Sequence, residues 1–336
     1  MKEKDWRTLC GITESFLGRK VAVAGDFVLD RFWYGHVQRV SREAPVPVVR
    51  LSASRYLLGC AANTVSNLAA LGARPLPVGV IGEDPEGELL LELLRDRDVA
   101  ASGLVRDPSW ITPTKTRVLA GSPHGSKQQL VRVDSGEENA YAPSTVQALR
   151  DAARPLFEEA EAVILSDYGY GLLEAMGVMD LLGSDRRTAL DSRFAMDRFP
   201  GVTTATPNEE EFADAAGEAS LSTPEALETG GEALRSRLGM EALLVTRGKR
   251  GMSLFEEGKA PLHLPVVGPD EVVDVTGAGD TVMATYVLAL CAGAGYTQAA
   301  QLANIAGGIV VQKHGTATTD AGELRDRIRA WGEGRI

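Results

Sequence analysis

The stretch Asp274-Val275-Thr276-Gly277-Ala278-Gly279-Asp280-Thr281 places three consecutive small residues between two carboxylates. The apolar pair Val272-Val273 before it and the apolar run 282–292 after it predict a strand, a glycine turn and the start of a helix. The small residues of the turn let backbone N–H groups converge on one point, where the helix N-terminus adds about half a positive charge. The stretch therefore predicts an anion site with the Asp280 carboxylate beside it.

A carboxylate beside an anion site suits phosphoryl transfer to a hydroxyl group. A base must take the proton of the hydroxyl while nearby donors balance the charge on the phosphoryl group. Asp280 is the candidate base, and the amides of Gly277, Ala278 and Gly279 are the candidate donors. An ordinary helix-capping aspartate after a glycine loop produces the same pattern, so this stretch alone leaves both interpretations open.

The composition excludes several other classes of protein. The 336 residues are 44% hydrophobic and 24% charged, as in soluble globular proteins. A net charge of -11 disfavours a nucleic-acid or membrane-surface protein, although local basic residues can still form a pocket for an anionic substrate. The three cysteines lack metal spacing, and no apolar run is long enough to span a bilayer. With no signal-type apolar core near the N-terminus, we expect a cytoplasmic protein.

Apolar strands alternate with amphipathic helices along most of the chain. The run Val21–Ala24 predicts a buried first strand that ends at Gly25-Asp26, and strand–helix units recur up to the C-terminus. We expect one α/β domain over residues 1–336, with a mostly parallel central sheet between two layers of helices. Ligands bind at the carboxyl ends of parallel strands, so Asp26 and Asp30 are candidates to bind sugar hydroxyls. A turn aspartate without a ligand is the alternative.

Two segments, at about 31–57 and 112–134, depart from this alternation. The first is rich in aromatic and β-branched residues, and its Pro45 and Pro47 forbid a helix and disfavour a central strand. The second predicts a hairpin around the loop 121–126. We expect both segments to form a small β lid that stands off the main sheet.

The polar face of the predicted hairpin carries Lys115, Arg117 and Arg132. These side chains are suited to grip an anionic group of a substrate. A solvated basic face without a ligand is the alternative. The aromatic residues of the first segment also suggest a homodimer, in which edge strands of two chains cover each other.

Three further positions place polar groups where a ligand can approach the backbone. Gly59 precedes a helix whose first turn contains Asn63, an amide suited to a sugar hydroxyl or to a plain polar helix start. Asn208 and Glu211 are three apart on one helical turn, which suits hydrated Mg²⁺ or a nucleotide phosphate as well as an acid-rich first turn. The strand ending Thr246-Arg247-Gly248 leads into a turn that either wraps a nucleotide or closes a hairpin.

Taken in order, these motifs resemble the ribokinase-like (PfkB) carbohydrate kinases over essentially the whole chain. The resemblance rests on Gly59–Asn63, on Asn208 with Glu211, and above all on Asp274–Asp280. Further stretches resemble the heptose 7-phosphate kinase domain of bacterial ADP-heptose synthesis. These stretches are Gly25-Asp26, Asp30-Arg31, Trp33-Tyr34-Gly35, and residues 43–49, 114–119, 128–130 and 165–168.

The resemblance implies a ribokinase-like fold and an ATP-dependent, Mg²⁺-dependent sugar kinase. The implied reaction phosphorylates the anomeric hydroxyl of D-glycero-D-manno-heptose 7-phosphate to the 1,7-bisphosphate. Asp280 is the implied base, residues 277–279 form the implied anion hole, and Asp26, Gly59 and Asn63 are the implied sugar contacts. By our own physical inference, Lys115, Arg117 and Arg132 hold the phosphate that the sugar already carries.

The resemblance also implies a nucleotide side and two cation sites. Nucleotide-side residues are Asn208, Glu211, Thr246, Gly248, Thr276 and Asn304, with Glu211 near Mg²⁺ through water. A monovalent-cation site, for K⁺, is implied at Asp274, Thr276, Val310, Gly315 and Thr319.

The chain departs from the heptose relatives at three places. Cys60 replaces the second glycine of a Gly-Gly pair, Asp191-Ser192-Arg193 replaces Asp-Pro-Lys, and residues 122–125 lengthen the hairpin loop. A kinase of the same fold with another sugar or nucleoside acceptor is therefore the nearest alternative. A dinucleotide-dependent oxidoreductase is disfavoured because no glycine pattern follows the first strand. A non-catalytic sugar-binding protein is disfavoured by the presence of Asp280.

Overall fold

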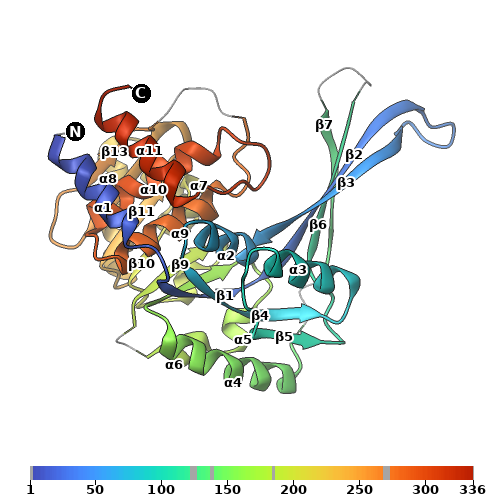
Figure 1. Cartoon of the computed structure of the whole chain (residues 1–336), viewed down its shortest axis with the longest axis horizontal. Helices are drawn as coiled ribbons and strands as arrows, with labels where there is room; N and C mark the ends of the chain where they lie inside the picture. Colours follow the sequence, from blue (N-terminus) through green and yellow to red (C-terminus); the bar gives the residue numbers. More distant parts are fainter. Residues whose placement is uncertain (1–2, 122–126, 137–139, 184–185, 268–272, 336) are drawn as a thin grey trace.

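The computed structural model describes residues 3–121, 127–136, 140–183, 186–267 and 273–335. A nine-stranded sheet has the order β13-β12-β11-β10-β9-β8-β1-β4-β5, and a separate four-stranded sheet has the order β3-β2-β6-β7. Helices lie on both faces of the larger sheet, and the smaller sheet projects from it as a long arm (Figure 1). The predicted three-layer α/β fold is confirmed.

The larger sheet is parallel from β5 to β11 and ends in two antiparallel strands, β12 and β13. Its strands are β1 (Lys20–Gly25), β4 (Arg74–Gly82), β5 (Gly103–Asp107), β8 (Ala162–Asp167), β9 (Thr188–Ser192), β10 (Thr204–Ala205), β11 (Ala242–Thr246), β12 (Met252–Glu256) and β13 (Leu262–Leu264). The run Val21–Ala24 in β1 is fully buried, because helices cover both faces of a parallel sheet.

The helices divide between two hydrophobic cores, one on each face of the sheet. One face is covered by α1 (Glu3–Glu14), α2 (Ala61–Ala70), α3 (Pro85–Arg95), α9 (Ala278–Cys291), α10 (Tyr296–Val310) and α11 (Ala321–Gly332). The other face is covered by α4 (Pro143–Glu159), α5 (Leu172–Ala175), α6 (Val178–Leu182), α7 (Glu209–Ala216) and α8 (Pro224–Arg237).

The smaller sheet consists of β2 (Phe27–Val40), β3 (Pro47–Cys60), β6 (Thr114–Gly121) and β7 (Gln128–Ser135). The strands expected to stand off the main sheet are therefore present. β2 continues the chain directly beyond β1, pairs antiparallel with β3 and runs parallel to β6. The predicted hairpin is the antiparallel pair β6–β7. Its expected lengthened loop, at residues 122–125, lies outside the described residues.

Two elements differ from the sequence-based expectation. The apolar spacing near 171–182 favours one helix, but the structure has two, α5 and α6, because Gly177 adopts a left-handed conformation with φ of 57°. The strand expected at Val272-Val273 is absent at Val273, which lies in a bend, whereas Val272 is outside the described residues. The N–H groups of Val273 and Asp274 both donate to the carbonyl of Val311, so this segment is tied to the end of α10 rather than to a sheet.

Among the residues with described structure, no helix combines the length and the apolar character that a bilayer crossing requires.

Candidate active site

Asp280 lies in the first turn of α9 and is 4% exposed. Three donors reach its carboxylate from α2 and from the loop after β8. Asn63 Nδ2 donates to Oδ2 at 2.7 Å, whereas Tyr168 Oη and Thr64 Oγ1 donate to Oδ1 at 3.1 and 3.3 Å. Segments far apart in sequence thus hold one buried carboxylate at the carboxyl end of the sheet.

Burial raises the pKa of Asp280 to about 6, and the hydrogen bonds from Asn63, Tyr168 and Thr64 oppose that rise. The carboxylate is therefore ionised near neutral pH and binds a proton more readily than an ordinary aspartate. These are the properties required of a general base.

The turn before α9 provides unpaired backbone donors. Gly277 has φ of 76°, and a Cβ at this position would lie 2.5 Å from Asn63 Nδ2. Ala278 N donates to the carbonyl of Val275 at 3.2 Å, so its amide is already engaged. Among the described residues, the N–H groups of Gly279 and Asp280 have no partner, and open space lies beside Gly279. An anion can therefore approach this helix N-terminus.

Two further carboxylates face this centre from the end of β1 and from β2. Burial raises the pKa of Asp26 to about 7, and its Oδ2 accepts hydrogen bonds from the N–H groups of Tyr168 and Tyr170 at 2.8 and 3.3 Å. Asp30 forms a largely buried ion pair with Arg117, at 2.6 Å. Gly59 allows this approach, because a Cβ there would lie 2.9 Å from Asp30 Oδ2.

The three basic residues of the predicted hairpin face have different partners. Arg117 is paired with Asp30, and the more exposed Arg132 is paired with Asp134 at 2.9 Å. Lys115 Nζ lies 3.3 Å from Cys60 Sγ and 5.1 Å from the centre of the Tyr168 ring. Within the described ranges Lys115 forms no ion pair with a carboxylate, so its ammonium group remains available to an anion.

Cys60, one of the three positions where we expect a departure from the heptose relatives, has an unusual backbone conformation. Its φ is 53° and its ψ is -131°, a region that residues with a side chain rarely adopt. The residue is buried at the end of β3, directly before α2. A glycine at this position would adopt the same conformation without strain.

The expected nucleotide-side residues gather at the start of α7. Asn208 and Glu211 form a capping box, in which Glu211 N donates to Asn208 Oδ1 at 3.0 Å and Asn208 N donates to Glu211 Oε2 at 2.8 Å. Their spacing thus has a structural role of its own. Thr246, at the end of β11, pairs with Asn208, and Gly248 begins the short 3₁₀ turn that follows.

The remaining expected residues lie around α10. Asn304 uses its amide to donate to the carbonyl of Pro265 at 2.7 Å. Asp274 accepts hydrogen bonds from Thr276 N and Gly315 N, both at 2.9 Å, so three of the expected cation-site residues are in direct contact. Thr319 donates instead to Glu323 at 3.0 Å, and Val310 is the buried last residue of α10.

Sequence reasoning missed Tyr168 and Asp191 as members of this centre. Burial raises the pKa of the Asp191 carboxyl well above its usual range, and repulsion from Asp280 and Glu211 adds to the effect. Both residues follow the pattern already applied to Asp26, since each lies at the carboxyl end of a parallel strand. Within the described part of the chain, no three or more acidic, histidine or cysteine side chains are grouped closely enough to hold a metal ion.

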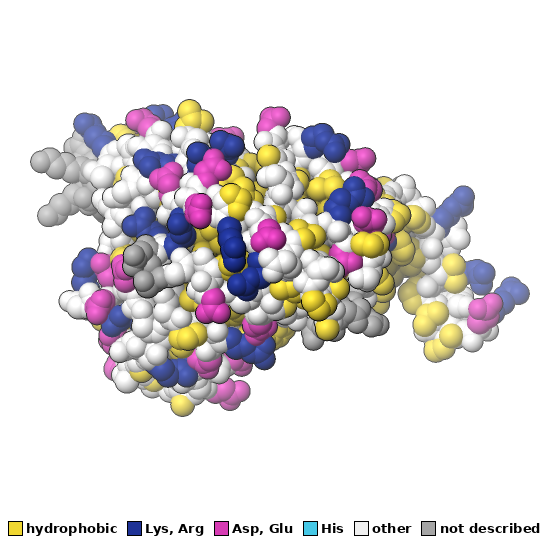
Figure 2. All heavy atoms as spheres, turned by 90° about the horizontal axis from the view of Figure 1, so that it is seen from below, with side chains coloured by type: hydrophobic (Ala, Val, Ile, Leu, Met, Phe, Trp, Pro, Cys, Tyr) yellow, Lys and Arg dark blue, Asp and Glu magenta, His cyan; other side chains and the backbone are white. Residues whose placement is uncertain are grey.

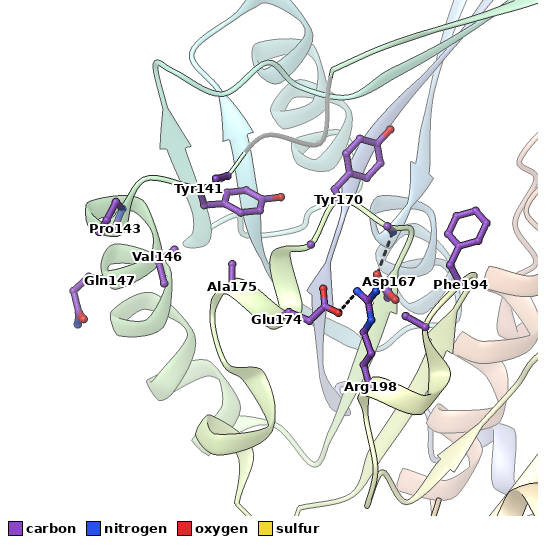
Figure 3. Close-up of a pocket in the computed structure, with 14 residues that line it drawn as sticks. Tyr141, Pro143, Val146, Gln147, Asp167, Tyr170, Glu174, Ala175, Phe194 and Arg198 are labelled. Atoms are coloured by element: carbon purple, nitrogen blue, oxygen red, sulfur yellow. Dashed lines mark hydrogen bonds and ion pairs between the residues drawn. The ribbon is translucent and has the colours of Figure 1, made fainter. Parts of the chain in front are cut away.

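A cavity of 760 Å³ opens beside this centre, and its lining does not include Asp280 (Figure 3). Tyr141, Tyr170 and Phe194 line it, and Arg198 and Glu174 form an ion pair at its wall. The side chains of Tyr168 and Tyr170 therefore lie in different places: Tyr168 contacts Asp280, whereas Tyr170 lines the cavity.

Fold and site together define a class of protein: three-layer α/β enzymes in which a buried carboxylate lies at a helix N-terminus that an anion can approach. Residues 20–321 match the pfkB family of carbohydrate kinases. The chain belongs to this family and is a phosphotransferase that acts on a sugar hydroxyl.

Among similar curated proteins, the bifunctional protein HldE of Chromohalobacter salexigens is 44% identical over 310 residues, which are 91% of this chain and 62% of that protein. The bifunctional protein HldE of Caulobacter vibrioides is 39% identical over 321 residues, which are 94% of this chain and 65% of that protein. The chain therefore spans less than two thirds of the length of these relatives.

Solved structures share the fold at low sequence identity. Arabidopsis thaliana ribokinase, complexed with ribose and ATP, has a TM-score of 0.73 at 20% identity and covers 93% of this chain and 99% of its own. Escherichia coli phosphofructokinase-2, in complex with potassium, has a TM-score of 0.75 at 17% identity and covers 94% and 100%.

Proposed function

We propose that the protein uses ATP to phosphorylate the anomeric hydroxyl of D-glycero-D-manno-heptose 7-phosphate. The observation that carries the chemistry is the buried Asp280 carboxylate, whose pKa near 6 and position beside free amides suit the base of a phosphoryl transfer. The acceptor is inferred from the likeness to HldE proteins over 91% of the chain and from the heptose-kinase motifs of the sequence.

Lys115 supports an acceptor that already carries a phosphate. Its ammonium group projects from β6 toward the centre formed by Cys60 and Tyr168, and it lacks a carboxylate partner within the described residues. A cation in that state is stabilised by an anionic ligand. Arg117 is weaker evidence for a phosphorylated acceptor, because the charge of its guanidinium group is already balanced by Asp30.

The residues present fit ATP and hydrated Mg²⁺. The amides of Gly279 and Asp280 are available to a phosphate, and Thr246 and Gly248 lie beside Asn208 on the nucleotide side. When bound, Mg²⁺ neutralises charge on the nucleotide phosphates. Glu211, at the start of α7, would hold it through water, because Mg²⁺ keeps several of its waters where few protein carboxylates are at hand.

The proposal extends to a potassium ion beside the phosphate turn. Each carboxylate oxygen of Asp274 accepts one hydrogen bond, Oδ1 from Thr276 N and Oδ2 from Gly315 N. A second lone pair on each oxygen therefore remains for a cation. Val310 and Thr319 complete the proposed site. Replacing KCl by choline chloride at equal ionic strength should lower kcat, and unchanged turnover would refute this part of the proposal.

A panel of acceptors tests the substrate. ATP consumption should be measured with heptose 7-phosphate, the unphosphorylated heptose, fructose 6-phosphate, ribose and a nucleoside. We expect the highest kcat/KM with heptose 7-phosphate, and Lys115→Met should raise the KM for that acceptor and not for the unphosphorylated heptose. A preference for another member of the panel would assign a different pfkB acceptor, whereas nucleotide binding without turnover on any sugar would favour a binding protein.

We also propose that the segments 31–57 and 112–134 act as a lid within a single kinase domain and join two chains in a homodimer. One face of the smaller sheet exposes Trp33, Val131 and Val133, which the strand register places side by side. Hydrophobic side chains lie among Lys and Arg on the projecting arm (Figure 2). Apolar side chains on a projecting β sheet are typically covered by a partner.

A further inference from the structure

Tyr168 contacts three members of the centre through three different groups. Its backbone N–H donates to Asp26 Oδ2 at 2.8 Å, its hydroxyl donates to Asp280 Oδ1 at 3.1 Å, and its ring lies under Lys115 Nζ at 5.1 Å. The hydrogen bond to Asp26 holds the backbone of Tyr168, and the Lys115 ammonium group packs against its ring. Its hydroxyl therefore has a defined position beside the base.

The donors are unevenly distributed over the two oxygens of Asp280. Each carboxylate oxygen has about two lone pairs that accept hydrogen bonds. Among the residues that the structure describes, Oδ1 accepts from both Tyr168 and Thr64, whereas Oδ2 accepts only from Asn63. Oδ1 is thus saturated, and one acceptor position remains open on Oδ2.

The Tyr168 hydroxyl has a single proton to donate, and its hydrogen bond to Asp280 Oδ1 uses that proton. Thr64, from α2, is the second donor to the same oxygen.

We propose that Tyr168 is a positioning residue for the base: its hydroxyl occupies Oδ1 of Asp280, so that Oδ2 is the atom that takes the proton of the acceptor hydroxyl. The hydrogen bond also stabilises the ionised form of the carboxylate, and so keeps the base available at lower pH. This inference rests on the proposed kinase activity, but it concerns a contact that is measurable without turnover.

Tyr168→Phe removes the hydroxyl and keeps both the ring under Lys115 and the backbone bond to Asp26. Loss of a donor to the ionised form raises the pKa of Asp280, so the acid limb of the kcat profile should move to higher pH by about one unit. At a pH below that limb kcat should fall about tenfold, and the loss should shrink as the pH rises. Tyr170→Phe is the matched control, because the Tyr170 side chain does not contact Asp280, and its acid limb should stay at the wild-type position.

A second measurement separates this inference from the proposed function. Titration of ¹³C-labelled aspartate carboxyls by NMR, with the Asp280 signal assigned by its loss in Asp280→Asn, reports the same pKa without any substrate. A higher pKa in Tyr168→Phe supports the proposal even if no sugar is phosphorylated, and an unchanged pKa overturns it even if the kinase is active. If Tyr168→Phe does not fold, Thr64→Val removes the other donor to Oδ1 and should move the signal in the same direction.

Discussion

At the scale of single residues, Asp280 should control the chemistry and contribute little to folding. Asp280→Asn keeps the shape of the side chain but cannot take a proton, so kcat should fall by about a thousandfold. The wild-type kcat should itself fall about tenfold per pH unit below pH 6, because only the ionised carboxylate is a base. A steady-state assay across pH measures both effects. Unchanged nucleotide affinity would show an intact fold, and near-wild-type turnover would exclude Asp280 as the base.

Cys60 should destabilise the chain through its backbone conformation. Cys60→Gly and Cys60→Ala both remove the thiol, but only alanine keeps a Cβ at φ of 53°. The glycine variant should therefore be more stable than the alanine variant by about 1 kcal/mol. Denaturant melts of the two variants give this difference directly, and equal midpoints would mean that the strain is absent.

Residue roles were only partly predictable from the sequence. Asp280 and Gly277 belong to a contiguous motif, so local chemistry marked them as candidates, although it left an ordinary helix-capping aspartate as the alternative. Tyr168 and Asp191 follow the same strand-end pattern as Asp26, but the local sequence does not indicate their partners, because the fold brings those side chains from distant segments. For Asn63, the predicted sugar contact stays a prediction, and the sequence did not reveal that its amide donates to Asp280, a pairing across 217 residues of sequence.

Among the secondary-structure elements, the turn into α9 contains two glycines, Gly277 and Gly279, that should respond differently to substitution by alanine. Gly277→Ala places a Cβ against Asn63 at a positive φ, so it should lower both the free energy of unfolding and kcat. In Gly279→Ala the added Cβ meets no atom of the described residues, so stability should be kept or raised by about 0.5–1 kcal/mol while the KM for ATP rises. Thermal melts and kinetics on both variants test this, and a loss of stability in Gly279→Ala would contradict it.

Helices and strands were predicted well where the periodicity of apolar residues determines them. They were predicted poorly where tertiary contacts or a single backbone conformation determine them. The buried strand β1 and the hairpin β6–β7 follow directly from apolar runs and alternation. The segment at Val273 is apolar enough for a strand, but its N–H donates to the end of α10. The α5–α6 break depends on the left-handed Gly177, which an amphipathic pattern does not reveal.

At the scale of the whole molecule, the exposed face of the smaller sheet should determine the oligomeric state. Val133→Glu places a charge among Trp33 and Val131, so we expect it to convert a dimer into a monomer. Sedimentation velocity measures the mass. Leu17→Glu, at a remote exposed position, is the control and should not change it. A wild-type monomer, or a Val133→Glu dimer, would exclude assembly through this face.

The long strand β2 has a consequence for how such enzymes diverge. Its first residues place Asp30 beside the proposed acceptor site, and Trp33 on the same strand lies on the face proposed for assembly. Selection for a new acceptor and selection for a stable assembly therefore act on the same 14 residues. Mutations that serve one requirement are constrained by the other, so changes of acceptor and changes of quaternary structure should tend to accumulate together in a lineage.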